Sequence, residues 1–500
     1  MGVVIRQSFK ATIVSYIGAC IGALLVIFIY PLSLSPEQIG LIRVLTEAGM
    51  FFSSFALLGT NSMAVKFFPF FKDKKNNDHG FSFLISFFPL IGFLIFIALF
   101  LAFKSLIVSM FETNSGLFSD YIIYVIPLTF FWMYITVYEN YSSILQRIVF
   151  PKLIKEVLVR ILTIISIALF YFKIINLNQF IFLFVSIYGI ATLLNILYVN
   201  VIGKFSYKPD FGFLKNPLRK EILVYMAFMI TAGIGANIAS KIDVFMLTQK
   251  VSLSGTGIFT IAFFIASFIE MPSRAIFQIT TPFASEALKN NDMVRLDSMY
   301  KRVSINQLVI ASLVFLLIWI NVDNIFQIMP NGEVFREGKY VILFIGLAKV
   351  FDAVTGLNVV LLSYSKYYYY TLYFIFFLAL ITIGNNLIFI PVYGIVGSAL
   401  ATAISIFLYH SIFVFFVKMK LKIQPFSINT VKAILIVSLM FFINAVTPHF
   451  SSGFVDIGIR SIFFLVLFIV FVYRFHISED INELIKDVNA RFLKGFFPLK

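Results

Sequence analysis

Nine charged side chains lie inside long apolar segments of this sequence, and they are its clearest candidates for chemistry. A charge near the centre of a bilayer costs at least about 2.5–3.5 kcal/mol on insertion scales, so such residues usually face a protein interior or a watery cavity. The cations are Arg43, Lys241, Arg274 and Lys349, and the acids are Glu47, Glu139, Asp243, Glu270 and Asp352. The cations are predicted to bind substrate, and the acids to be coupling groups or structural partners.

The spacing of these charges along the predicted helices leaves two interpretations open. Three pairs share one helical face, namely Arg43 with Glu47, Glu270 with Arg274, and Lys349 with Asp352. Residues three or four apart are neighbours on a helix, so each pair can neutralise itself. The pairs are therefore either buried salt bridges that hold helices in register, or they carry cations that receive an anion. A guanidinium matches a phosphate group through its bidentate fork.

The composition places these charges in a membrane. The chain has 500 residues, of which 60% are hydrophobic and 13% are charged, and its mean hydropathy is +0.97. Soluble domains carry about 25% charged residues. Apolar runs of about 18 residues or more recur from end to end, which predicts an all-α polytopic membrane protein. The net charge of +15 comes from basic residues in short loops, so no nucleic acid is expected as a partner.

Several kinds of catalytic and metal site are not expected. The single Cys20 lies in an apolar segment and the four histidines are scattered, which argues against a metal site. No G-x-x-x-x-G-K-[ST] motif is present, so ATP hydrolysis by a P-loop is not expected. The short loops offer little room for the catalytic carboxylates of a glycosyltransferase or polymerase. The protein is predicted not to be an enzyme and to hold no cofactor, with H⁺ or Na⁺ as candidate coupling ions.

Two smaller features have structural interpretations. The Gly233-x-Gly235 pattern lacks the preceding strand and third glycine of a dinucleotide loop, and is expected to mark close helix packing or a hinge. His410 is expected to be a packed or interfacial histidine, with a part in a proton-coupling path as the alternative.

Fourteen transmembrane helices are predicted from the apolar runs. They span about 11–30, 39–68, 81–103, 120–143, 153–175, 179–203, 221–247, 256–280, 303–322, 339–362, 369–390, 394–417, 431–447 and 458–474. Lysine and arginine are concentrated in alternate loops, which the positive-inside rule places in the cytoplasm. Both termini are then cytoplasmic, as an even number of helices requires.

An internal repeat predicts the domain organisation. PFFKDKKNND (69–78) is similar to PFASEALKNND (282–292), Ile39-Gly40 corresponds to Thr256-Gly257, and SIYGIATLLNILY (186–198) is similar to PVYGIVGSALATAISIFLY (391–409). Two six-helix lobes related by a pseudo-twofold axis along the membrane normal would follow, although biased apolar sequence can also resemble itself. The predicted parts are lobe 1–205, linker 206–220, lobe 221–417, two further helices in 418–474, and an amphipathic cytoplasmic tail 475–500.

Two stretches carry a resemblance to a known family. They are KIDVFMLTQKVSLSGTGIFTIAFFIASFIEMPSRAIFQITTPFASEALKNND (241–292) and IPVYGIVGSALATAIS (390–405). In order and spacing they resemble the helix 7–8 region and the helix 12 signature of the oligosaccharide flippases (Wzx-like) of the multidrug/oligosaccharidyl-lipid/polysaccharide exporter superfamily. Ser398 stands where alanine is common in that signature.

The resemblance implies two lobes around a V-shaped cavity, alternating access, and a polyprenyl-pyrophosphate-linked oligosaccharide as cargo. It also implies the bacterial cytoplasmic (inner) membrane and a role in surface polysaccharide biosynthesis, such as O-antigen or capsule. Expected partners are the lipid-linked oligosaccharide, membrane lipids, a polysaccharide polymerase and glycosyltransferases. The alternatives are a cation-coupled multidrug antiporter and a flippase for a lipid II-type precursor on the same fold.

Overall fold

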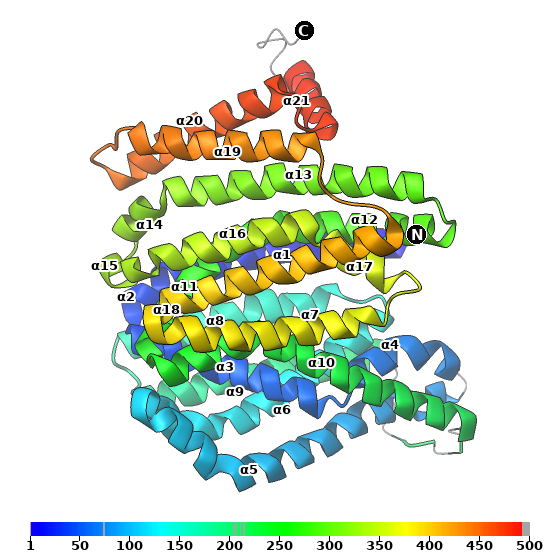
Figure 1. Cartoon of the computed structure of the whole chain (residues 1–500). Coiled ribbons are helices and arrows are strands. Elements are labelled where there is room, and N and C mark those ends of the chain that lie inside the picture. Colours follow the sequence, from blue (N-terminus) through cyan, green and yellow to red (C-terminus); the bar gives the residue numbers. More distant parts are fainter. Residues whose placement is uncertain are drawn as a thin grey trace. The chain divides into compact units, whose positions relative to one another are not determined.

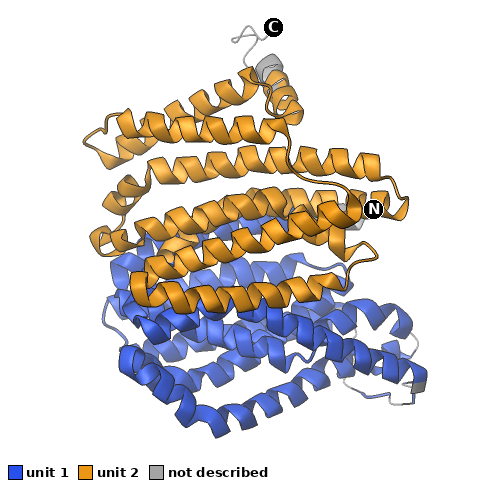
Figure 2. Cartoon of the chain, in the orientation of Figure 1, with its two compact units in different colours: residues 1–260 blue, residues 261–500 orange. Residues whose placement is uncertain are grey.

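The computed structural model describes residues 2–73, 76–203, 205, 208–210, 212–213 and 216–492. Every regular element among these residues is a helix, which confirms the all-α class (Figure 1). By their contacts the helices form two compact units, residues 1–260 and residues 261–500 (Figure 2). The predicted domain boundaries stay predictions. In the predicted linker, residues 206–207, 211 and 214–215 lie outside the described residues, as do residues 493–500 of the predicted tail.

The first unit holds the elements from α1 to α10 and the beginning of α11. These are α1 (Gly2–Ala23), η1 (Leu24–Ile29), α2 (Tyr30–Ser33), α3 (Pro36–Ala56), α4 (Thr60–Phe71), η2 (Asn77–Gly80), α5 (Phe81–Tyr121), η3 (Ile122–Tyr124), α6 (Val125–Ile144), α7 (Val149–Leu153), η4 (Ile154–Leu158), α8 (Val159–Tyr171), α9 (Leu177–Gly203), α10 (Asn216–Lys250) and α11 (Leu253–Ser267).

Local sequence signals determine where α3 begins and ends. Ser35 Oγ accepts a hydrogen bond from the Gln38 backbone N–H at 3.2 Å, and Gln38 Oε1 accepts one from the Ser35 N–H at 3.0 Å. This reciprocal capping box gives hydrogen-bond acceptors to two backbone N–H groups that have none within the helix. Pro36, at the first helical position, has no N–H group that would need an acceptor. Leu58 and Gly59 then take positive φ values of 47° and 74°. The predicted second helix is therefore two helices, α3 and α4.

The second unit holds the rest of α11 and the elements that follow it. These are η5 (Phe268–Glu270), α12 (Met271–Lys289), α13 (Met293–Ile320), α14 (Val322–Ile328), α15 (Gly332–Phe335), η6 (Arg336–Gly338), α16 (Lys339–Thr355), α17 (Leu357–Ser363), α18 (Tyr370–Leu421), α19 (Ile428–Val446), α20 (Gly453–Arg474) and α21 (Glu479–Phe492).

Within the part of the chain that the structure describes, ten helices are long and apolar enough to cross a membrane. The number is up to eleven if the bent pair Gly332–Thr355 and Leu357–Ser363 counts as one span. The chain is thus a multi-pass membrane protein, and the number of fourteen spans stays a prediction. The number of helical elements can differ from the number of membrane crossings. A single element that turns sharply at one residue can contain two antiparallel helical segments.

The 52-residue helix α18 is such a case. At Gly394 the backbone has φ 55° and ψ −127°, and the chain turns back on itself there (Figure 1). Asn385 donates a hydrogen bond to Ser405 Oγ at 2.9 Å, and the Phe374 and Phe413 rings stack with centroids 4.4 Å apart. These contacts pair the two arms of α18 in antiparallel order.

A second bend lies between α16 and α17. The helix direction changes by 42° at this break. A Cβ at Gly356 would lie 2.8 Å from both the Asp352 carbonyl oxygen and the Phe277 ring. A side chain at Gly356 would therefore require the Phe277 ring of α12 to shift.

Candidate functional site

In the first unit, three of the predicted site residues form one cluster. Glu47 of α3 is buried. Its carboxylate forms an ion pair at 2.8 Å with Arg43, which lies one turn earlier on the same helix. Its second carboxylate oxygen pairs with Lys241 of α10. We call Arg43, Glu47 and Lys241 the Glu47 cluster. Two cations share one carboxylate, so the cluster carries an excess positive charge.

The second unit contains a cluster of the same composition. Glu270 ends η5, and its Oε1 accepts from Arg274 Nε of α12 at 3.1 Å. Its Oε2 pairs with Lys349 of α16 at 2.5 Å. We call Glu270, Arg274 and Lys349 the Glu270 cluster. It too has two cations for one carboxylate, and the side chain of Arg274 is 71% exposed.

The predicted pairing of Lys349 with Asp352 is wrong. Lys349 turns to Glu270, and Asp352 instead accepts from His410 Nε2 at 2.8 Å. The interpretation of His410 as merely packed is incomplete, because it is buried and also holds a carboxylate. Nothing in the spacing of Asp352 and His410 could have indicated this contact, since they lie on different helices.

The other two predicted acids, Glu139 and Asp243, lie on α6 and α10 of the first unit. Glu139 of α6 pairs with Lys155 of η4 at 2.9 Å, a partner that the sequence analysis did not single out. Asp243 is buried on α10, two residues after Lys241. Gly233 does not mark close packing, because a Cβ there would meet nothing within 4 Å.

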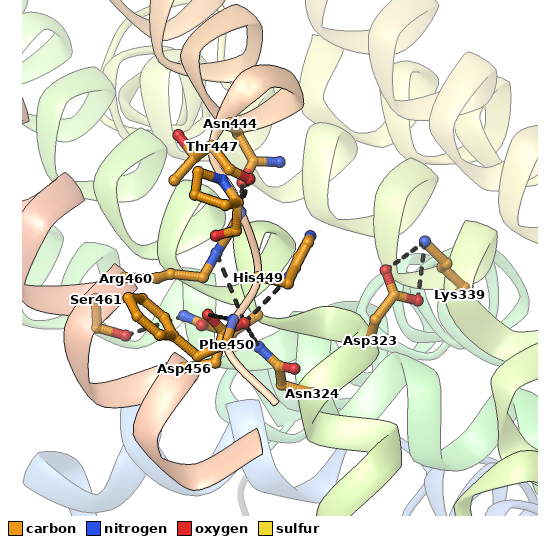
Figure 3. A network of polar contacts seen from close by, with 12 residues as sticks. Asp323, Asn324, Lys339, Asn444, Thr447, His449, Phe450, Asp456, Arg460 and Ser461 are labelled. Carbon is orange, nitrogen blue, oxygen red and sulfur yellow. Dashed lines mark hydrogen bonds and ion pairs between the residues drawn. The ribbon is translucent and has the colours of Figure 1, made fainter. Parts of the chain in front are cut away.

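A buried polar network at the α19–α20 connection was also missed (Figure 3). Asp456 accepts from Asn324 Nδ2 at 2.6 Å, from the Phe450 N–H at 3.1 Å and from His449 at 3.1 Å. Arg460 lies one turn further along α20 and is 1% exposed. These residues fix the connection between two helices and tie it to α14, so their role is structural.

The two clusters can do more than hold helices in register. An arginine has five N–H donors, and a shared carboxylate uses only part of that capacity. Among the described residues, the buried Nε of Arg43 has no hydrogen-bond partner. Arg274 is largely exposed while its partner carboxylate fixes its position. Each cluster therefore presents an oriented guanidinium with donors left over, the geometry that suits a phosphate group.

Comparison with known proteins gives the fold. No protein-family model matches the chain, and no curated protein matches its sequence. Among solved structures, it is similar to the lipid II flippase MurJ in its inward closed conformation, with a TM-score of 0.72 and 15% identity, over 95% of this chain and 99% of that one.

Two multidrug resistance MATE transporters of the MOP superfamily are also similar. The inward-facing structure has a TM-score of 0.62 at 15% identity, over 80% of this chain and 93% of that one. The outward-facing structure has a TM-score of 0.56 at 16% identity, over 84% of this chain and 95% of that one. The fold is similar to that of these three transporter structures. The fold implied by the resemblance is thus confirmed, and membership of the exporter superfamily and of its Wzx-like branch stays a prediction.

Proposed function

We propose that this protein is a flippase for an anionic polyprenyl-linked glycolipid of the bacterial cytoplasmic membrane. Its cargo would be a polyprenyl-pyrophosphate-linked oligosaccharide destined for a surface polysaccharide. The observation that carries the proposal is the pair of clusters with excess positive charge, one built on Glu47 and one on Glu270. A transporter of this fold with such clusters is suited to receive an anionic head group.

The physics favours outward transfer of such a head group. A membrane potential that is negative inside assists outward movement of an anion by about 2.3 kcal/mol per charge per 100 mV. The cationic clusters offset part of the cost of removing the pyrophosphate from water, while the polyprenyl tail stays in lipid. Binding must also be weak enough for release. Cations already shared with Glu47 and Glu270 meet this requirement better than unpaired ones.

A lipid II-type precursor is the second candidate cargo. The similarity to the lipid II flippase MurJ extends over 95% of this chain, against 80% for the inward-facing MATE structure. Both candidate cargoes offer the same polyprenyl-linked pyrophosphate to the clusters. Export of organic cations is less favoured, because the carboxylates of Glu47, Glu270 and Asp352 already have cationic or imidazole partners.

The proposed cycle is alternating access, with both termini in the cytoplasm and H⁺ or Na⁺ as the coupling ion. A polysaccharide polymerase and glycosyltransferases would be the functional partners, since they consume and supply the lipid-linked glycan.

Deletion of the gene followed by lipid analysis tests the function. Lipid-linked oligosaccharide is expected to accumulate on the cytoplasmic leaflet, where an impermeant glycan-modifying reagent cannot reach it in intact cells. Accumulation of lipid II instead would assign the second cargo. If neither lipid accumulates in the deletion strain, and returning the wild-type gene does not change how either lipid is distributed between the leaflets, the flippase proposal is wrong.

A further inference from the structure

His410 and Asp352 form a buried acid–base pair that the two cationic clusters do not use. His410 lies on the second arm of α18 and Asp352 on α16, and the Nε2–Oδ1 distance is 2.8 Å. The side chain of His410 is 4% exposed and that of Asp352 is 36% exposed, so the carboxylate is the open side of the pair. In the described part of the chain, the buried Nδ1 of His410 has no hydrogen-bond partner.

The charged and titratable neighbours of the pair lie on its own two helices. Tyr409 of α18 contacts the His410 ring edge-on, with centroids 4.8 Å apart, and Lys349 of α16 is held by Glu270 of η5. Lys349 is one turn before Asp352 on the same helical face, yet it pairs with Glu270. Asp352 and Glu270 are therefore two carboxylates within reach of one lysine, and His410 occupies only one of them.

We propose that His410 and Asp352 are the proton-binding site of this transporter, and that its proton decides which carboxylate holds Lys349. The inference rests on the proposed flippase function, because it gives the Glu270 cluster a part in binding and release of the anionic head group. In the structure Lys349 is paired with Glu270, which corresponds to the state in which the proton is bound.

The proton balance is simple. In the tautomer of neutral His410 that donates Nε2–H to Asp352, Nδ1 carries a lone pair. One proton bound at Nδ1 makes an imidazolium beside the carboxylate, so the pair changes from one negative charge to none and no other bond changes. When the proton leaves, the negative pair attracts Lys349 away from Glu270. The Glu270 cluster then loses a cation from the place where the head group would bind.

The neighbouring bend supplies the element that can move. Asp352 is in the last turn of α16 before Gly356, where α16 and α17 meet at 42°. Beyond the bend, Asn358 accepts a hydrogen bond from Tyr300 of α13. The pair therefore ties one side of the bend to α18, while Asn358 ties the other side to α13. A change in the charge of the pair acts directly beside this bend.

Reconstitution of the purified full chain tests the proposal. The protein is placed in phosphatidylcholine vesicles that contain a polyprenyl-pyrophosphate-linked oligosaccharide, and flipping is followed with and without a pH gradient. His410→Gln keeps a side-chain N–H that can donate to Asp352 but cannot take up a proton. Because it holds the pair in its negative state, it is expected to flip the lipid more slowly than the wild type and to lose the acceleration that the pH gradient gives the wild type. His449→Gln, which keeps a donor to Asp456, is the matched control and should retain the acceleration.

A second measurement is independent of transport. Histidine labelled with ¹⁵N at Nδ1 alone gives one ring signal for each of the four histidines, and the signal absent from His410→Gln identifies His410. This signal is expected to change from that of a neutral imidazole to that of an imidazolium as the pH is lowered. A signal that does not change, or a His410→Gln protein that responds to the gradient like the wild type, overturns the proposal. A wild type that flips no lipid under any condition refutes the flippase function instead.

Discussion

Gly40 of α3 and Gly257 of α11 pack directly against each other, and neither position has room for a Cβ. A Cβ on Gly40 would lie 3.2 Å from the Gly257 nitrogen and closer still to the Leu253 carbonyl oxygen. A Cβ on Gly257 would lie 3.1 Å from the Gly40 nitrogen and closer still to the Pro36 carbonyl oxygen. The sequence repeat pairs these same two glycines. At these two glycines the backbones of α3 and α11 approach each other directly.

Gly40→Ala is expected to destabilise the protein. The added methyl group would meet backbone atoms that cannot rotate away, and overpacking of this kind costs about 1–3 kcal/mol. A lower midpoint of thermal unfolding in detergent is the expected result. Gly233→Ala is the matched control, because a Cβ there meets nothing within 4 Å. Equal midpoints for Gly40→Ala and the wild type would show that the helices can separate without cost.

The site could be predicted from the sequence only as far as contacts are local. Arg43–Glu47 and Glu270–Arg274 were identified because four-residue spacing on one helix fixes neighbours, whatever the tertiary structure. Lys241 reaches Glu47 across 194 positions, and Lys349 reaches Glu270 across 79. Such contacts depend on which helices pack together, which one sequence does not determine.

The fold shows the same division between local and tertiary information. Hydropathy predicted an all-α membrane protein because the bilayer imposes helices on long apolar runs. It could not predict the break at Gly59, since apolar residues lie on both sides of it. Arg460 illustrates the limit for single residues. It is nearly fully buried, and its buried contacts depend on how the α19–α20 connection folds back.

Lys241→Met separates the two interpretations of the Glu47 cluster. If the cluster binds an anion, removal of one cation should lower flipping while Glu47 keeps Arg43 as a partner. If the cluster is only structural, stability should fall instead. Glu47→Gln leaves two cations without their carboxylate and is expected to cost more stability than Lys241→Met. The double variant measures the coupling between the two residues, expected at about 0.5–3 kcal/mol for groups in contact.

Arg274→Ala is expected to impair flipping with little effect on stability. Its side chain is 71% exposed, and surface substitutions usually change stability by less than about 0.5 kcal/mol. Flipping in vesicles and the unfolding midpoint should be measured on the same preparation. Arg295→Ala removes another exposed arginine of the second unit, outside both clusters, and serves as the control. Equal flipping by both variants would exclude Arg274 from head-group binding.

Arg460→Ala is expected to be strongly destabilising. Arg460 donates to the carbonyl oxygens of Thr447 at 3.3 Å and Pro448 at 3.1 Å, and also to the Asn444 side chain (Figure 3). Its removal leaves these acceptors buried and takes a cation from the neighbourhood of Asp456. Breaking a buried charged network by removing one partner costs about 3–5 kcal/mol. The unfolding midpoint in detergent reports the loss.

Arg336→Ala is the control for Arg460→Ala. Arg336 is 48% exposed and pairs with Glu333 at 3.2 Å, an exposed pair of the kind that contributes about 0.2–1 kcal/mol. If both variants unfold at the same temperature, burial of Arg460 does not have the stabilising role that its contacts indicate.

Asp480 anchors the beginning of α21 to α13. Arg302 Nε donates to its two carboxylate oxygens at 2.8 and 2.7 Å, and Asn306 donates at 2.6 Å. The hydrogen bond from Arg302 holds the pKa of the Asp480 carboxyl below its usual value, against the opposing effect of burial. A carboxyl with a lowered pKa in the docked state stabilises docking above its ordinary pKa, near 3.9. That contribution is lost as the pH falls through the lowered pKa of the docked state.

Docking of α21 is therefore expected to be pH-dependent in acid. Hydrogen exchange of the backbone amides of α21 should be slow at neutral pH and should accelerate, after correction for the intrinsic pH effect, below about pH 4. Asp480→Asn removes the charge, so its α21 should exchange faster at neutral pH and show no further acid transition. Asp487→Asn changes an exposed acid of the same helix and should retain the wild-type profile. If Asp480→Asn keeps the acid transition, a different group controls the docking of α21.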